Sequence, residues 1–128
     1  MKPEPEKQII VGGDEHTFSE FTKSGLKAEG YHVTFCGDLM DLKNKASEAG
    51  HVCAVIVDGD MKAFSQINMH SEAFCKRQNK RPLLLLTAHY SLTTLAKTLQ
   101  AGFDEFLAKP VGKEECIALI NKHETKTK

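Results

Sequence analysis

Short apolar runs alternate with longer amphipathic stretches along the chain. Runs of four to six residues that are rich in Val, Ile, Leu, Phe and Ala are typical of strands buried in a parallel sheet. We therefore predict five strands, over residues 8–12, 31–36, 52–57, 83–87 and 105–108. In the second run, Tyr31, Val33 and Phe35 alternate with polar residues, and this period of two predicts an edge strand.

The stretches between these runs carry apolar residues at helical spacing. They predict five helices, over residues 17–29, 39–48, 64–78, 91–101 and 113–123. Asp38 is a suitable N-cap for the second helix, and Gly30 is a suitable C-cap for the first. The apolar face of the fourth helix consists of Leu92, Leu95 and Leu99.

Strict alternation of strands and helices predicts an α/β protein. Right-handed crossovers place the helices on both faces of a parallel sheet. For five such units we predict a flavodoxin-like, doubly wound (βα)5 fold with a five-stranded parallel sheet in the order 2-1-3-4-5. The whole chain, 1–128, is then a single domain with a core over about 7–122, a polar leader 1–6 and a polar tail 123–128.

Composition narrows the functional class. Of the 128 residues, 41% are hydrophobic and 27% are charged, as in a soluble globular protein. The formal net charge is zero, so no overall electrostatic attraction to nucleic acid or to an anionic membrane is expected. No apolar run approaches the roughly 20 residues that span a bilayer, and residues 1–7 lack the apolar segment of a secretory signal. We therefore expect a cytoplasmic protein.

The four cysteines do not predict a metal site or a disulfide framework. Cys36, Cys53, Cys75 and Cys116 form no CxxC pair and have no His at a ligand spacing. We interpret them as buried or half-buried thiols in a reducing compartment.

Four polar residues follow or close the apolar runs: Asp14, Asp58, Thr87 and Lys109. Ligands of open α/β sheets bind at the carboxyl ends of the strands, where these residues would converge. A carboxylate can accept a phosphoryl group, and oxygen ligands suit Mg²⁺. A lysine and a hydroxyl supply donors for the charge on the phosphoryl oxygens. The set predicts phosphoryl transfer onto Asp58.

Segments 9–15, 54–61, 83–88 and 101–110, in this order, resemble the receiver domain of bacterial two-component response regulators. The resemblance covers residues 7–122. The residue numbers of its successive key positions, Asp14, Asp58, Thr87 and Lys109, differ by 44, 29 and 22. It implies that Asp58 is the phosphoacceptor and Asp14 a direct Mg²⁺ ligand. It also makes the backbone carbonyl of Asp60 a further Mg²⁺ ligand.

The same resemblance assigns the remaining residues. Lys109 is the phosphate-binding ammonium, Thr87 the switch hydroxyl and Phe106 the switch aromatic, and the Lys109–Pro110 bond is cis. The phosphoryl group would come from a histidine kinase or a phosphotransfer protein. Phosphorylation would change a protein-binding surface made by the fourth helix, fifth strand and fifth helix. This surface would bind a downstream protein partner and not nucleic acid.

The resemblance further implies that the domain is not an enzyme that acts on external substrates, and the sequence defines no oligomeric state. A chain of 128 residues leaves no room for a DNA-binding output domain. It is therefore either a stand-alone regulator or the receiver of a larger protein.

The chain departs from the family pattern after its first strand. Two adjacent acids are usual there, but Gly13 stands in the place of the first; alternatively, a shifted register pairs Asp14 with Glu15. Losing an outer-shell partner costs about 10–100-fold in metal affinity. Lys62 also replaces the usual proline. The alternative function is therefore a pseudo-receiver that signals without phosphorylation, and a third is an enzyme of flavodoxin-like fold with a cofactor site.

His89 lies two residues beyond Thr87. We interpret it as an exposed surface residue, with control of water access to the phosphate as the alternative.

Overall fold

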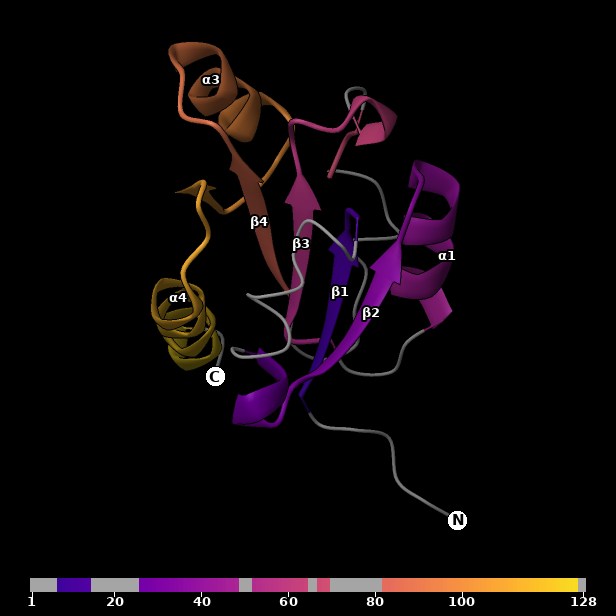
Figure 1. The fold of residues 1–128 in the computed structure, drawn as a ribbon, viewed down its shortest axis with the longest axis vertical. Coiled ribbons are helices and arrows are strands. Elements are labelled where there is room, and N and C mark those ends of the chain that lie inside the picture. The colour runs from indigo at the N-terminus through magenta and orange to yellow at the C-terminus, as the bar shows by residue number, and fades with distance from the viewer. Residues whose placement is uncertain (1–6, 15–25, 49–51, 65–66, 70–81, 127–128) are drawn as a thin grey trace.

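The computed structural model describes residues 7–14, 26–48, 52–64, 67–69 and 82–126. Its centre is a five-stranded sheet in the order β2-β1-β3-β4-β5, with every neighbouring pair parallel (Figure 1). This confirms the predicted flavodoxin-like α/β fold and strand order. The strands are β1 (Gln8–Gly12), β2 (His32–Cys36), β3 (Ala54–Asp58), β4 (Leu83–Ala88) and β5 (Glu105–Ala108).

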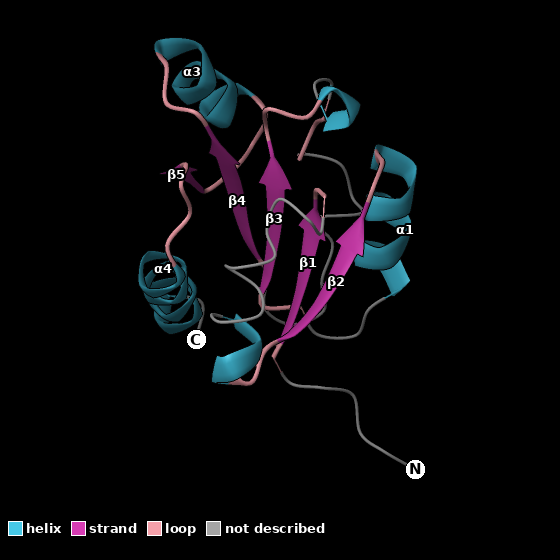
Figure 2. Cartoon of the chain, in the orientation of Figure 1, coloured by secondary structure: helices cyan, strands magenta, loops and turns pink. Residues whose placement is uncertain are grey.

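Within the described residues, three α-helices and two short 3₁₀ helices accompany the sheet (Figure 2). They are η2 (Lys27–Glu29), α1 (Leu39–Glu48), η3 (Lys62–Phe64), α3 (Leu92–Gln100) and α4 (Lys113–Lys126). Helix α1 has its predicted bounds, and the Asp38 carboxylate accepts the Asp41 N–H at 2.8 Å, as expected of an N-cap. None of these helices, in the described part of the chain, is long and apolar enough to cross a membrane.

Some predicted helix bounds are wrong. The described end of the first helix is a 3₁₀ turn, which Gly30 ends with φ of 91°, a conformation that favours glycine. Residues 67–69 are not helical, so the prediction of a third helix from residue 64 fails at its start. Helix α4 continues to Lys126 and includes most of the predicted tail. Residues 17–25 and 70–78 of the predicted helices lie outside the described residues.

Alternate strand residues point to opposite faces of the sheet and form two apolar layers. One layer packs against α1 and η3 and contains Ile10, Leu42, Ala46, Val55, Val57, Phe64, Leu84 and Leu86. The other packs against α4 and the segment before η2 and contains Ile9, Val11, Leu26, Ala54, Ile56, Leu83, Leu85, Cys116 and Ile120. The central strands β1, β3 and β4 are buried, whereas β2 is partly exposed, as predicted for an edge.

The described cysteines belong to this interior. Cys36, Cys53 and Cys116 are buried, as the sequence predicts. Burial raises the pKa of Cys116 to about 12. Burial, helped by the nearby Asp41, raises that of Cys36 to about 12 as well. Both thiols are therefore protonated at neutral pH and are poor nucleophiles.

Helix α3 packs in a way that its sequence does not predict. A capping box between Ser91 and Thr94 begins the helix. Two of its three apolar residues point outward, since Leu92 is 78% exposed and Leu99 is 80% exposed, whereas Leu95 is half-buried. Thr98 is buried instead, and its hydroxyl donates to the Thr94 carbonyl at 2.8 Å.

The register of the sheet brings the ends of four strands together at one edge. Asp58 of β3 pairs with Thr87 of β4. Ala88 pairs with Ala108, the residue before Lys109. On the other side, β1 ends where Gly12 pairs with Val57, so the chain emerges from β1 next to Asp58.

Gly12 is a position of close approach, which yields a first prediction. A Cβ added there would lie 3.0 Å from Cζ of the fully buried Phe64 and 3.2 Å from Cδ2 of Leu42. Gly12→Ala should therefore lower the free energy of unfolding by about 1–3 kcal/mol through overpacking. Urea denaturation measures this change.

The matched control is Gly37→Ala, because nothing lies within 4 Å of a Cβ added at Gly37. It should change the free energy of unfolding by no more than about 0.5 kcal/mol. Equal stability of the two variants would contradict the close packing of Gly12.

Candidate functional site

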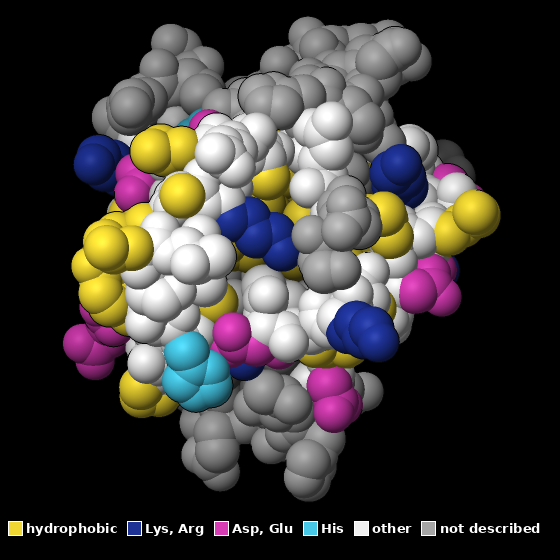
Figure 3. All heavy atoms as spheres, turned by 90° about the horizontal axis from the view of Figure 1, so that it is seen from above, with side chains coloured by type: hydrophobic (Ala, Val, Ile, Leu, Met, Phe, Trp, Pro, Cys, Tyr) yellow, Lys and Arg dark blue, Asp and Glu magenta, His cyan; other side chains and the backbone are white. Residues whose placement is uncertain are grey.

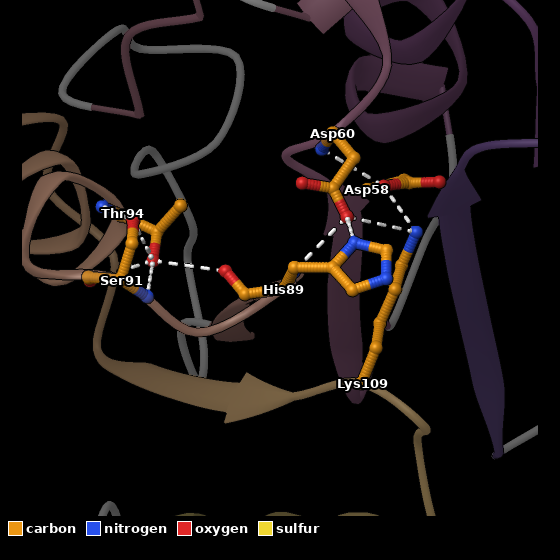
Figure 4. Close-up of polar contacts among 6 residues, drawn as sticks. All are labelled: Asp58, Asp60, His89, Ser91, Thr94 and Lys109. Atoms are coloured by element: carbon orange, nitrogen blue, oxygen red, sulfur yellow. Dashed lines mark hydrogen bonds and ion pairs between the residues drawn. The ribbon is translucent and has the colours of Figure 1, made fainter.

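Asp58 is the centre of the site at the carboxyl edge of the sheet. It is the last residue of β3 and is only 2% exposed. Its Oδ1 accepts the backbone N–H of Asp60 at 2.9 Å and lies 2.9 Å from Nζ of Lys109 (Figure 4). A buried carboxylate is costly unless it is hydrogen-bonded and paired with a cation, and both conditions are met here.

Lys109 follows β5 directly and reaches across the edge to both acids. Its backbone N–H donates to the Ala88 carbonyl at 2.9 Å, which fixes the start of the side chain. Its Nζ lies between Oδ1 of Asp58 and Oδ2 of Asp60, 3.2 Å from the latter. Burial acts to lower the pKa of Lys109, but the two carboxylates outweigh it and raise the pKa above its ordinary value. The ammonium is therefore charged at neutral pH.

The side chain of Asp60 makes contacts that the sequence interpretation missed, because it used only the backbone carbonyl of this residue. Its Oδ2 accepts the backbone N–H of His89 at 3.0 Å and lies 2.7 Å from Nδ1 of the same residue (Figure 4). Burial acts to raise the pKa of Asp60, but hydrogen bonds from His89 and Lys109 outweigh it and lower the pKa. Asp60 is therefore ionised at neutral pH.

His89 is 82% exposed, which confirms its prediction as a surface residue, although its ring also binds Asp60. A signal for this contact is present in the sequence. Asp60 follows Asp58 by two residues, and His89 follows Thr87 by two. Because Asp58 and Thr87 pair across the sheet, residues at equal offsets beyond them lie near one another.

Thr87 and Phe106 occupy the side of the site toward β5. Thr87 is fully buried, and its Oγ1 has no hydrogen-bond partner within the described residues. A buried hydroxyl without a partner is energetically unfavourable, so a group that offers it an acceptor would draw it into a new contact. Phe106 is half-buried against the core, with its ring centroid 6.4 Å from that of the exposed Tyr90.

Asp14 is exposed just beyond the end of β1. The preceding residue, Gly13, is buried, and its N–H donates to the Cys36 carbonyl at 3.0 Å. Gly13, which has no side chain, comes directly after Gly12, and Gly12 pairs with Val57, the residue before Asp58. The structure therefore places only one acid, Asp14, after β1 among the described residues, and β1 does not extend through Gly13.

The donor set at this edge suits a hard divalent cation. Asp14 and Asp58 offer carboxylates and Asp60 a backbone carbonyl, and Mg²⁺ prefers such oxygen ligands. Asp58 and Asp60 together carry two negative charges that share the ammonium of Lys109. The described residues contain no group of three or more His, Cys, Asp or Glu side chains arranged to hold a metal. The Lys109–Pro110 bond is cis, as the resemblance implied.

The lowered pKa of Asp60 yields a second prediction. A carboxylate whose folded pKa lies below its ordinary value, about 3.9, stabilises the fold above that value and loses this contribution as the pH falls through the folded value. Near pH 6, wild type should be more stable to urea than Asp60→Asn by up to about 1 kcal/mol, a modest value because Asp60 is partly exposed. The difference should shrink as the pH falls below the ordinary pKa and be lost once the pH passes the lowered pKa of Asp60.

Glu48→Gln is the control, because it makes the same charge change on the exposed surface of α1. A difference between wild type and Asp60→Asn that stays constant from neutral to acid pH would contradict the assignment.

Comparisons with known proteins give the family and the fold of this chain. The family model described as the response regulator receiver domain matches residues 9–121. The chain is 27% identical over 112 residues to the uncharacterized transcriptional regulatory protein YkoG of Bacillus subtilis. The aligned region covers 88% of this chain and 48% of that protein. The chain spans about half the length of the curated relatives it matches.

Solved structures share the fold. The receiver domain of sensor histidine kinase PA1611 from Pseudomonas aeruginosa has a magnesium ion coordinated in its active site cleft. It superposes with a TM-score of 0.69 at 20% identity, over 91% of this chain and 95% of that one. A response regulator receiver domain protein from Methanospirillum hungatei gives 0.68 at 22% identity, over 94% and 98%. From the match of the family model, the chain belongs to the response regulator receiver domain family.

Proposed function

We propose that this domain accepts a phosphoryl group on Asp58 from a histidine kinase or a phosphotransfer protein. The observation that carries the proposal is the ion pair of 2.9 Å between the buried Asp58 carboxylate and Lys109. Phosphoryl transfer needs an acceptor oxygen and a cation that neutralises the phosphoryl oxygens. This pair supplies both at the edge of the sheet where ligands of such folds bind.

The contacts of Asp58 assign a role to each of its oxygens. Oδ1 accepts the Asp60 N–H and faces Lys109, so we assign the attack on phosphorus to Oδ2. A bond forms between Oδ2 and phosphorus and gives an acyl phosphate. The phosphorus–nitrogen bond of the donor phosphohistidine breaks, and the imidazole leaves. Lys109 stays within reach of the transferred oxygens and stabilises their charge.

Asp14, Asp58 and the backbone carbonyl of Asp60 would hold Mg²⁺. When bound, the ion neutralises negative charge on the phosphoryl group. Gly13 leaves out one acid beside this set, so we expect weak binding.

Phosphorylation would then change the surface formed by α3, β5 and α4. The Thr87 hydroxyl, which has no partner among the described residues, would gain a phosphoryl oxygen as acceptor. The half-buried Phe106 would then repack into the space that Thr87 leaves. Figure 3 looks onto the carboxyl edge and shows hydrophobic side chains gathered on the side where α3 lies. The exposed Leu92 and Leu99 of α3 would contribute to binding of a downstream protein.

The domain thus acts in the cytoplasm by taking up and losing its own phosphoryl group and not by turning over an external substrate.

One observation favours a second candidate, a pseudo-receiver that signals without phosphorylation. Gly13 is buried and offers no carboxylate beside Asp58, which weakens the metal site.

Intact-mass spectrometry after incubation with acetyl phosphate tests the proposal. Wild type should gain the mass of one phosphoryl group, and only when Mg²⁺ is present, because the charge on the phosphoryl oxygens must be neutralised. Asp58→Ala, which removes the acceptor, should gain none. Folded wild type that takes up no label at any Mg²⁺ concentration would overturn the proposal in favour of the pseudo-receiver.

The switch gives a further prediction. Thr87→Ala removes the hydroxyl but leaves Asp58 and Lys109, so labelling should persist within about tenfold of wild type, since one hydrogen bond is lost. Amide resonances of α3 should shift on phosphorylation of wild type and shift much less in the variant. Equal shifts in both proteins would show that Thr87 does not transmit the change.

A further inference from the structure

One oxygen of Asp60 binds three donor atoms. Oδ2 lies 3.2 Å from Nζ of Lys109, 3.0 Å from the backbone nitrogen of His89 and 2.7 Å from Nδ1 of the same His (Figure 4). An ammonium, a backbone N–H and an imidazole N–H are the kinds of donor that bind an anionic oxygen. The contacts therefore form an anion-binding set, and the Asp60 carboxylate occupies it.

This set lies beside the phosphoacceptor. The ammonium of Lys109 that contacts Asp60 also lies 2.9 Å from Oδ1 of Asp58. The backbone nitrogen of His89 follows the end of β4, whose Thr87 pairs with Asp58. A phosphoryl group on Asp58 would bring its oxygens to the same ammonium, so it would compete with Asp60 for these donors.

The Asp60 carboxylate and a phosphoryl group on Asp58 would repel each other if both bound these donors at once. Asp58 and Asp60 already share one ammonium. A phosphoryl group adds about 1.5 to 2 negative charges at neutral pH. Like charges that contact the same ammonium in a partly buried site repel one another strongly. Asp60 is the acid with room to move away, because its side chain is 32% exposed and that of its partner His89 is 82% exposed, whereas Asp58 is buried.

We propose that the Asp60 carboxylate is a built-in occupant of the phosphoryl-binding donors and must leave Lys109 and His89 before Asp58 can be phosphorylated. The inference rests on the proposed function of Asp58 as the acceptor. Asp60 then sets how readily the domain takes up a phosphoryl group. His89, as a positioning residue, holds Asp60 in place through its ring.

The test compares initial rates of Asp58 labelling by acetyl phosphate with Mg²⁺. Asp60→Asn keeps the backbone carbonyl and the shape of the side chain but removes its charge. It should label about tenfold faster than wild type, because a charge-assisted hydrogen bond is worth at least that factor. His89→Ala should also label faster, but by less, since the ammonium and the backbone N–H still hold Asp60. Glu48→Gln should label at the wild-type rate.

Binding of beryllofluoride, a phosphoryl analogue, supplies a second readout that needs no covalent transfer. Fluorine NMR titration should give an apparent Kd about tenfold lower for Asp60→Asn than for wild type, for the same electrostatic reason. Asp60→Ala serves as a second variant, and circular dichroism establishes that each protein is folded.

The outcomes separate this inference from the proposed function. If wild type is labelled but neither Asp60 variant is labelled faster or binds beryllofluoride more tightly, the role of Asp60 as an occupant is wrong and Asp58 remains the acceptor. If neither wild type nor any folded variant is labelled, Asp58 is not an acceptor and both proposals fail. Labelling of the Asp60 variants but not of wild type would support the proposal that the Asp60 carboxylate blocks phosphorylation of Asp58.

Discussion

The contact between Lys109 and Asp58 is the interaction on which the site depends. Removing a carboxylate from water costs several kcal/mol even after the protein relaxes, and Asp58 is only 2% exposed. The ammonium at 2.9 Å and the backbone N–H of Asp60 compensate this cost. In the proposed function the same ammonium would stabilise an incoming phosphoryl group, so one contact would both keep a buried charge in the fold and prepare the site for phosphoryl transfer.

The parallel sheet is what makes this contact possible. Asp58 ends a central strand whose neighbours, β1 and β4, are both buried. Lys109 comes from the edge strand β5, and its backbone is tied to β4 through Ala88. Since every pair of strands is parallel, all carboxyl ends meet at one edge. Polar groups can lie there because the apolar layers on the two faces stabilise the sheet without them.

The contacts of Asp60 with Lys109 and His89 are the distinctive feature of this site. Its carboxylate takes donors from Lys109 and His89 that a phosphoryl group would need, while its backbone nitrogen holds Asp58. In the proposed function, one residue would support the acceptor through its main chain and oppose phosphorylation through its side chain. Together with the missing acid at Gly13, this arrangement is what distinguishes the proposed phosphoryl-binding site of this domain.

The sequence by itself determined where the strands lie and that Asp58 and Lys109 stand at their ends, because apolar periodicity and the polar residue after each strand are local signals. The strand order was predicted from the fold that five alternating units favour. The sequence did not reveal that Leu92 and Leu99 of α3 point outward or that residues 67–69 are not helical. Nor did it reveal the contact between Asp60 and His89, 29 residues apart. Those features were decided by tertiary structure alone, because they depend on which strands are neighbours, in which register, and on which surface each helix covers.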